Sequence, residues 1–170
     1  MKIYYALLAV IIVERIFELV VSQRHARASL AEGGIEYGQG HFPLMVALHV
    51  GLILGCVIEP IVTHAPFIPA LAYPMIVVVI AANVLRWWCI AALGPRWSAR
   101  VIVIPGRPLV HDGPYKWFAH PNYVAVVVEG AALPLIGSAW ITALTFTALN
   151  IWLLTVRLRC ETSALATAAP

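Results

Sequence analysis

The sequence predicts an all-α integral membrane protein, folded as one five-helix transmembrane bundle that ends in a C-terminal helical hairpin. Hydrophobic residues make up 62% of the 170 residues and charged residues only 11%, and the mean hydropathy is +0.88. Soluble domains carry about 25% charged residues, so this composition indicates a chain embedded in lipid. Five stretches approach the roughly 20 apolar residues that cross a bilayer as a helix.

The five predicted spans occupy most of the chain and leave no room for a separate soluble domain. We therefore expect a single domain over residues 1–170. In chain order the predicted spans are Ile3–Ser22, Pro43–Thr63, Phe67–Leu93, Asn122–Ile136 and Ala139–Arg157.

The fourth and fifth spans are expected to form a tight antiparallel hairpin. Pro134 interrupts the short fourth span, and Gly137 and Ser138 supply a turn and a helix start. A fifth helix that runs from Ala139 to Ala164 is longer than the roughly 30 Å hydrocarbon core. Its polar end is therefore expected in the headgroup region or beyond it.

Positive charge outside the predicted spans is strongly biased to one side of the bundle. Lys2 falls on one side, and all the others fall on the opposite side: Arg24 and Arg27 in the first connection, Arg96, Arg100, Arg107 and Lys116 in the third, and Arg157 and Arg159 at the end. By the positive-inside rule, the N-terminus is outside and the C-terminus is in the cytoplasm. The net charge of +3 then reflects topology and attraction to anionic headgroups. The sequence has no basic stripe of the kind that binds nucleic acid.

The third connection holds the longest polar and turn-rich passage of the chain, residues 107–123 (RPLVHDGPYKWFAHPNY). Val101–Ile104 reads as a short strand, and residues 110–114 contain a polar turn. Pro121 is expected to open the fourth helix, whose free N–H groups and positive dipole end favour a carboxylate or phosphate. Alternatively, His120 only caps this helix and the neighbouring aromatic residues form an interfacial belt.

Arg157 and Glu161 form a second polar cluster. They lie four residues apart and so share one face of the fifth helix. The hairpin brings this helix end beside the start of the fourth helix, and the two polar ends together would suit a zwitterion. The alternative is membrane anchoring by the arginine and a surface ion pair.

Ionisable residues inside spans are costly and often functional. Glu14, Arg15 and Glu18 lie in the first span and Arg86 lies in the third. The partner of Arg86 must come from another helix, and Glu18 and Glu129 are the candidates. These residues either fix the helix register as buried ion pairs or bind the polar head of a substrate.

No metal or haem site is predicted. His41 and His49 are eight residues apart, but no carboxylate or cysteine stands at ligand spacing beside either of them. His49 is then a polar contact within the second span. Cys56, Cys89 and Cys160 show no CxxC spacing and are interpreted as packing residues.

The run GRPLVHDGPYKWFAHPNY, followed by a hydrophobic hairpin and by RLRCETSAL, resembles the C-terminal half of the isoprenylcysteine carboxyl methyltransferase family. In that family a GPY element, an RHPxY element and a terminal RxxxEE element surround S-adenosylmethionine. The resemblance covers about Leu93 to Leu165. It implies a cofactor-binding half at residues 94–165, substrate-side helices at residues 1–93, and a cytoplasmic cofactor loop. The cofactor-binding residues it implies are Val110, Gly113, Tyr115, His120, Pro121, Tyr123, Arg157 and Glu161.

Two positions depart from the family's elements. The arginine before His-Pro is Ala119 here, and the second terminal glutamate is Thr162. The first change removes whatever contact that arginine makes. The second leaves Glu161 as the terminal carboxylate for a cofactor amine or ribose.

The N-terminal region points to one branch of the family. The run ERIFELVVSQRHARASLAEGGIEYGQGHFPLMVALH, from Glu14 to His49, is similar to bacterial alkylpyrone and alkylresorcinol O-methyltransferases encoded beside type III polyketide synthases. This resemblance implies a multi-pass protein of the bacterial inner membrane with its active site facing the cytoplasm. The implied partners are membrane lipid and a lipophilic small-molecule acceptor, with a type III polyketide synthase as the pathway neighbour.

Methyl transfer is an in-line displacement, so the protein must hold the acceptor oxygen opposite the sulfonium and exclude water. The faces of Tyr115 and Tyr123 suit a sulfonium cation. An acidic acceptor does not require a strong general base. His49, Glu18 and Arg86 are the candidate catalytic residues that would orient the acceptor, and the sequence leaves the choice among them open.

Two alternatives to the polyketide acceptor remain open at this level. One is methylation of another lipid, such as a prenylcysteine carboxylate or a phospholipid amine. The other is a non-catalytic membrane protein, such as a quinone- or haem-binding subunit that has kept the bundle.

Overall fold

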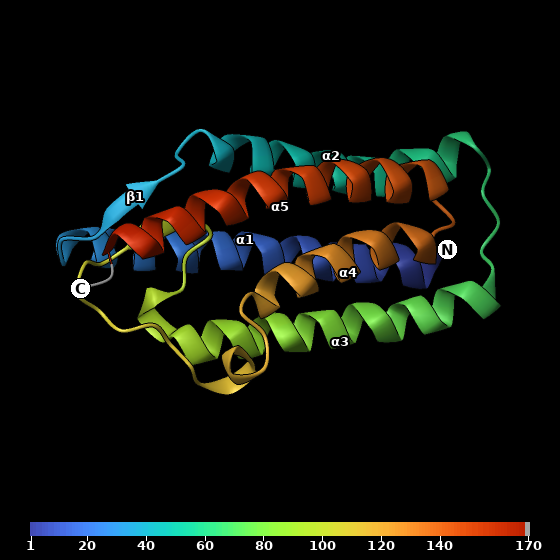
Figure 1. The fold of residues 1–170 in the computed structure, drawn as a ribbon. Helices are drawn as coiled ribbons and strands as arrows, with labels where there is room; N and C mark the ends of the chain where they lie inside the picture. Colours follow the sequence, from blue (N-terminus) through green and yellow to red (C-terminus); the bar gives the residue numbers. More distant parts are fainter. Residues whose placement is uncertain (169–170) are drawn as a thin grey trace.

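The computed structural model describes residues 1–168, with side chains through residue 166, and places five long helices side by side in one bundle (Figure 1). The predicted all-α class is confirmed. The helices are α1 (Lys2–Ala31), α2 (His41–Val62), α3 (Pro69–Leu93), α4 (Pro121–Ile136) and α5 (Trp140–Ala168). The connections contain two short strands, β1 (Ile35–Tyr37) and β2 (Val101–Val103), and two 3-10 turns, η1 (Gly94–Arg96) and η2 (Gly113–Lys116).

Three of the helices, α2, α3 and α5, are long and apolar enough to cross a membrane. This confirms the prediction of a membrane protein. Helix α1 carries Glu14, Arg15 and Glu18 near its middle, and α4 has only 16 residues. The number of five spans therefore stays a prediction, although all five helices are present.

Helix α1 is longer than its apolar run, and this corrects one prediction. Arg24 and Arg27, expected in the first connection, lie on α1, which continues to Ala31. The segment after Ser22 is rich in alanine, arginine and other good helix formers, so the helix does not end where the hydrophobicity ends. Gly33, with φ of +87°, follows the helix end and takes a conformation that favours glycine.

The predicted hairpin of α4 and α5 is present, with its turn at residues 137–139. A Cβ atom on Gly130 would lie 2.1 Å from the ring of Phe146. The two helices therefore approach more closely than any residue larger than glycine permits at this crossing. This tight contact fixes the start of α4 relative to the C-terminal half of α5.

Glu59, near the end of α2, caps the start of α5. Its carboxylate accepts hydrogen bonds from the backbone N–H groups of Ile141 and Thr142 at 2.9 and 2.7 Å, and from the Thr142 hydroxyl at 2.6 Å. Those N–H groups have no partner within the helix, so the carboxylate both satisfies them and opposes the positive dipole end. The cap ties α2 to the hairpin.

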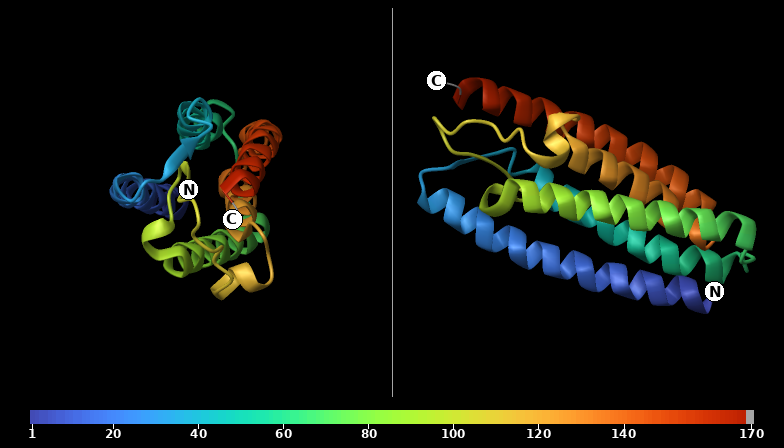
Figure 2. Two further views of the ribbon diagram at one scale, coloured as in Figure 1. Left: turned by 60° about the vertical axis from the view of Figure 1, so that its left-hand side comes forward. Right: turned by 90° about the horizontal axis from the view of Figure 1, so that it is seen from below.

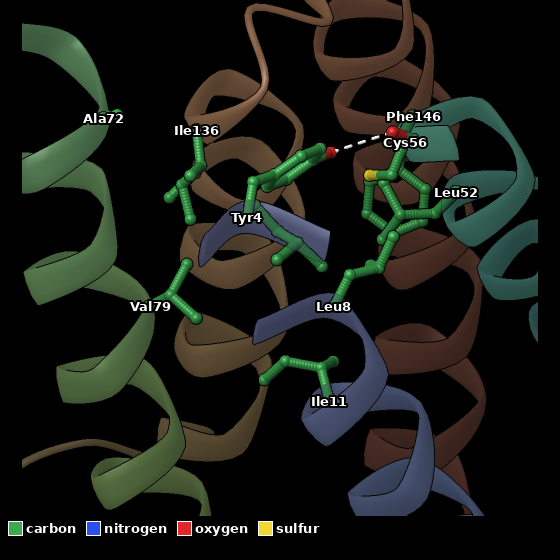
Figure 3. Close-up of a cluster of buried hydrophobic side chains, with 11 residues drawn as sticks. Tyr4, Leu8, Ile11, Leu52, Cys56, Ala72, Val79, Ile136 and Phe146 are labelled. Carbon is green, nitrogen blue, oxygen red and sulfur yellow. Dashed lines mark hydrogen bonds between the residues drawn. The ribbon is translucent and has the colours of Figure 1, made fainter. Parts of the chain in front are cut away.

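The apolar core of the bundle gathers around Tyr4 of α1 (Figure 3). Its ring packs among side chains of the other four helices, and its hydroxyl donates a hydrogen bond to the carbonyl of Cys56 at 3.0 Å. Cys56 and Cys89 are both buried, as expected of packing residues. Tyr4, Leu8 and Ile11 belong to the N-terminal part of α1, so the core lies toward that end of the helix.

The opposite end of the bundle is built by connections. Strands β1 and β2 pair antiparallel, with Ile35 opposite Val103 and Tyr37 opposite Val101. This ribbon joins the first connection to the third, beside the C-terminal part of α5 (Figure 2). The sequence predicted β2 but not β1. The N-terminus, the α2–α3 connection and the α4–α5 turn lie together at the other end (Figure 1).

This separation of the two ends gives a direct test of membrane orientation. Asp112 and Thr63 are exposed and lie in connections at opposite ends of the bundle. In a Cys160→Ser background, which removes the half-buried thiol, we expect an impermeant maleimide to label Thr63→Cys in intact cells and Asp112→Cys only after permeabilisation. Labelling of both from the same side would contradict the five-span topology.

Candidate active site

A cavity of about 330 Å³ lies between α1, α2, α4 and α5, with Arg86 of α3 and residues 97–99 of the third connection also in its wall. Aliphatic side chains form most of this wall. Five predicted site residues, distant in sequence, line the same cavity: Glu18, His49, Arg86, Tyr123 and Arg157. The predicted acceptor-side residues and two of the predicted cofactor-binding residues thus share one space.

Tyr123, in the first turn of α4, connects the two polar clusters. Its hydroxyl donates a hydrogen bond to the Glu161 carboxylate and accepts one from Arg157 Nε at 3.0 Å. The guanidinium carbon of Arg157 also lies 5.9 Å from the centre of the Tyr123 ring. The expected meeting of the α4 start with the end of α5 is therefore present.

Arg157 is buried, and its other nitrogens hold the third connection and α2 in place. Nη2 donates to the carbonyl of Ala99 at 2.5 Å, and Nη1 contacts the Met45 sulfur at 3.2 Å. The N–H of Ala99 in turn donates to the Ser22 hydroxyl of α1 at 2.9 Å. Arg157 therefore joins α5, α4 and α2 around the cavity and has one weak partner, the thioether.

His120 and Pro121 take the positions that the sequence predicted at the start of α4. Pro121 is buried at the first helical position, and His120 occupies the N-cap with an extended φ of −135°. The His120 side chain makes no capping hydrogen bond. Its ring is stacked on Tyr123 instead, at 5.4 Å between ring centres and 8° between planes. The ring thus supports Tyr123 from the side of the loop.

The remaining loop residues pack on α3. Gly113 has φ of +58°, and a Cβ atom there would lie 3.0 Å from both Ala92 and the Trp88 indole nitrogen. The Tyr115 hydroxyl is hydrogen-bonded to the Cys89 thiol, and burial, together with Cys89, raises the pKa of Tyr115. Val110 is half-buried before this turn. Among the described residues, these three do not line the large cavity.

A network of buried charges forms the polar part of the cavity wall. Arg86 donates to Glu129 at 2.5 Å and lies 3.7 Å from Glu18, so both partners considered for it are correct. Arg15 lies 3.0 Å from Glu18 and 3.6 Å from Glu129. The fifth member, Glu14, accepts a hydrogen bond from the Trp87 indole. The network ties α1, α3 and α4 together.

His49 lines the cavity, and one of its two ring nitrogens has no hydrogen-bond partner among the described residues. Its Nδ1 lies 2.8 Å from the carbonyl of Met45, one turn earlier on α2. Because a carbonyl only accepts hydrogen bonds, Nδ1 carries the proton and Nε2 carries a lone pair. No described residue bonds to Nε2, and the ring packs edge-on against Phe146 at 5.4 Å. This tautomer suits a proton acceptor.

The apolar part of the cavity wall is shared by α1 and α2. Ile16 and Leu19 of α1 and Val50 and Leu54 of α2 line it, yet they are 58%, 37%, 52% and 53% exposed. These exposed fractions show that the cavity wall is open to the outside of the bundle between α1 and α2.

Two asparagines in the cavity wall were not predicted from the sequence. Asn122 precedes Tyr123 on α4, and its buried Oδ1 accepts no hydrogen bond from a described residue. Asn150 of α5 is 1% exposed, and its Nδ2 likewise has no described partner. The sequence did offer a sign of Asn150: its amide lies inside an apolar span, and burying an amide without a hydrogen bond is costly.

The fold and site together define an integral membrane protein whose cavity combines a charged and aromatic end with an aliphatic, partly exposed wall. The sequence pattern of the isoprenylcysteine carboxyl methyltransferase (ICMT) family matches residues 75–167, more than half of the chain. The chain belongs to this family. Members of the family are membrane methyltransferases that use S-adenosylmethionine, and this places the chain among membrane methyltransferases.

Two bacterial relatives match almost the full chain. The uncharacterized protein YpbQ of Bacillus subtilis (strain 168) is 33% identical over 163 residues, which cover 95% of this chain and 96% of the relative. An uncharacterized protein of Haemophilus influenzae is 27% identical over 158 residues, covering 92% and 91%. The similarity thus extends through the N-terminal helices, outside the segment that the family pattern matches.

Proposed function

We propose that this protein is an S-adenosylmethionine-dependent O-methyltransferase that acts on the hydroxyl of a membrane-soluble alkylpyrone or alkylresorcinol. One observation carries the proposal. A single cavity is lined by Tyr123, Arg157 and His49 and by a partly exposed aliphatic wall, and Glu161 is hydrogen-bonded to Tyr123 behind its polar end. Such a cavity suits a polar methyl donor at one end and a long-chain acceptor at the other.

The polar end fits S-adenosylmethionine chemically. The unpartnered Asn122 Oδ1 and the Glu161 carboxylate are acceptors for an ammonium or ribose hydroxyls, and the Tyr123 face suits a sulfonium. Arg157 suits the donor's carboxylate, which would replace the weakly bound Met45 sulfur. His120 supports the Tyr123 ring. Val110, Gly113, Tyr115 and Pro121 would hold the loop that closes this end.

When bound, S-adenosylmethionine supplies an electrophilic methyl group: the bond from the acceptor oxygen to carbon forms, the bond from sulfur to carbon breaks, and S-adenosylhomocysteine leaves. The chain's own part is to orient the acceptor and take its proton. We assign the proton to His49 Nε2. Glu18 and Arg86 are already engaged in ion pairs of the buried network. Their role would therefore be to keep the polar part of the cavity wall in place beside the acceptor.

The partly exposed aliphatic wall supports an acceptor with a long alkyl chain. The exposed aliphatic residues of α1 and α2 that line the cavity would contact that chain, and each buried methylene contributes about 0.8 kcal/mol. We propose the bacterial cytoplasmic membrane as the location, with the Tyr123 end facing the cytoplasm. A type III polyketide synthase would supply the acceptor.

A product assay tests the acceptor. The purified protein is supplied with labelled S-adenosylmethionine and, separately, with an alkylpyrone, an alkylresorcinol, a prenylcysteine and an amine phospholipid. We expect a methyl ether of the alkylpyrone or alkylresorcinol by mass spectrometry. A product only from the prenylcysteine would replace the polyketide acceptor with the carboxylate that the family's name describes.

Calorimetry with S-adenosylhomocysteine tests whether the protein is an enzyme of this class at all. We expect saturable binding by the purified protein and no haem absorption band. Absence of binding, together with a haem band or quinone binding, would favour a non-catalytic membrane subunit.

Glu161→Gln is expected to weaken S-adenosylhomocysteine binding roughly ten- to hundredfold, because a lost charge-assisted hydrogen bond costs about 1.5–3 kcal/mol. Calorimetry measures the change, and circular dichroism checks that the helices persist. Glu36→Gln is the matched control, because Glu36 pairs with Arg100 on the β1–β2 ribbon. Equal affinity in Glu161→Gln and wild type would show that Glu161 only holds Tyr123.

A further inference from the structure

Asn150 differs from most of the buried polar side chains because the nitrogen of its side-chain amide has no hydrogen-bond partner among the described residues. It is 1% exposed, lines the large cavity, and its Nδ2 finds no acceptor among the described residues. A buried amide without a hydrogen bond is costly, and native proteins rarely keep one. An amide that packing does not use is therefore available to a ligand in the cavity.

The place of Asn150 on α5 relates it to both ends of the site. Phe146, Asn150, Leu153 and Arg157 are all buried and follow each other at intervals of three or four residues, so they form one face of the helix. Asn150 lies about 10 Å along the axis from Arg157. It is also four residues, about 6 Å along the axis, from Phe146, against which the His49 ring packs.

His49 and Asn150 line the same cavity, and Phe146, one turn from Asn150, contacts the His49 ring. A ring that presents one oxygen to His49 can therefore present a second oxygen to Asn150 within this cavity. An amide both donates and accepts, so it bonds equally to a carbonyl and to a hydroxyl.

We propose that Asn150 is a specificity residue that hydrogen-bonds the second ring oxygen of the acceptor, so that the site selects a six-membered ring with two oxygens in meta relation. This inference rests on the proposed function and names the residue that would recognise the second oxygen of its substrate class. A hydroxypyrone offers a carbonyl at that place and a resorcinol offers a second hydroxyl. A monohydroxy alkylphenol offers neither, and its binding would leave the amide unpaired.

The experiment compares an alkylresorcinol with the monohydroxy alkylphenol of the same chain length. In the wild type, kcat/KM is expected to be at least about tenfold higher for the resorcinol. Asn150→Leu, which is similar in size and apolar, is expected to lose that preference through a roughly tenfold fall with the resorcinol and no fall with the phenol. Binding of S-adenosylhomocysteine is expected to stay unchanged.

A second readout separates ligand binding from packing. Because the Asn150 Nδ2 has no hydrogen-bond partner among the described residues, Asn150→Leu is expected to keep or raise the thermal unfolding midpoint. Thr145→Val, a polar-to-apolar change on the exposed side of the same helix, is the matched control and should alter neither preference nor affinity. If Asn150→Leu does not fold, Asn150→Ser provides the same test, since the shorter serine side chain does not reach the second ring oxygen of the acceptor.

The outcomes distinguish this inference from the function on which it rests. Two results would overturn the role of Asn150 alone. In both, the wild type methylates the resorcinol, but either it shows no preference over the phenol or the Asn150 variants keep that preference. No wild-type methylation of any alkylpyrone, alkylresorcinol or alkylphenol would overturn the proposed function and, with it, this inference.

Discussion

Replacing Arg86 with methionine is expected to lower the free energy of unfolding by about 3–5 kcal/mol, because it leaves buried carboxylates without their cation. The Arg86 guanidinium donates to Glu129 at 2.5 Å and lies 3.7 Å from Glu18, and all three side chains are less than 10% exposed. Only Arg15 would remain among the three carboxylates of the network. Equilibrium unfolding in mixed micelles, followed by circular dichroism, measures the loss.

Arg107→Met is the matched control, because it removes an arginine from an ion pair with almost the same N–O distance that is exposed and not buried. Arg107 lies 2.6 Å from Glu32, and the two side chains are 53% and 49% exposed. Exposed pairs contribute about 0–1 kcal/mol, so this variant should unfold nearly as the wild type does. Similar small losses in both variants would show that the buried network is not a main source of stability.

A double variant, Arg86→Met with Glu129→Met, separates the structural role of Arg86 from a role with the acceptor. Replacing a buried ion pair by apolar side chains of similar size often restores stability. If stability returns and methyl transfer returns with it, Arg86 acts only within the network. If stability returns and transfer does not, the guanidinium orients the acceptor, as the sequence allowed.

The elements that the sequence predicted correctly are those set by local chemistry. Apolar runs gave all five helices, Pro121 opened α4, and the turn at Gly137 formed the hairpin, because each depends on residues within a few positions. The partners of Arg86 were also predictable. A charge inside an apolar helix must be neutralised from a neighbouring helix, and few carboxylates were available.

The elements that the sequence missed depend on contacts between distant segments. Strand β1 exists because it pairs with β2, some 65 residues away. Ile35 and Tyr37 favour strands, but a run of three residues is too short to give a clear local signal. The position of Asn150 at the cavity likewise follows from how α5 packs against the other helices. An uncharged polar residue within a span, such as Asn150, indicates that a hydrogen-bond partner is needed, but many groups could serve and the sequence does not identify which one does.

His49→Gln is expected to reduce methyl transfer to an alkylresorcinol about a hundredfold or more at pH 7, the effect typical of losing a general base. The Nδ1–H of His49 donates to the carbonyl of Met45, and this fixes the lone pair on Nε2. A phenolic hydroxyl has a pKa of about 10 and keeps its proton at pH 7, so it needs an acceptor for that proton. Glutamine is similar in size and polar but supplies no base.

The dependence on acceptor and on pH tests this role of His49 against a packing role. A more acidic hydroxypyrone is already ionised at neutral pH and should lose much less activity in the variant. For the resorcinol, the deficit should shrink as pH rises toward about 10, because the acceptor then ionises without help. His111→Gln, at an exposed loop position, is the control and should leave both rates unchanged. An acceptor that is already ionised has no proton to give up, so losing a general base should not slow its methylation. An equal loss with both acceptors at every pH would therefore mean that His49 packs against Phe146 and shapes the cavity.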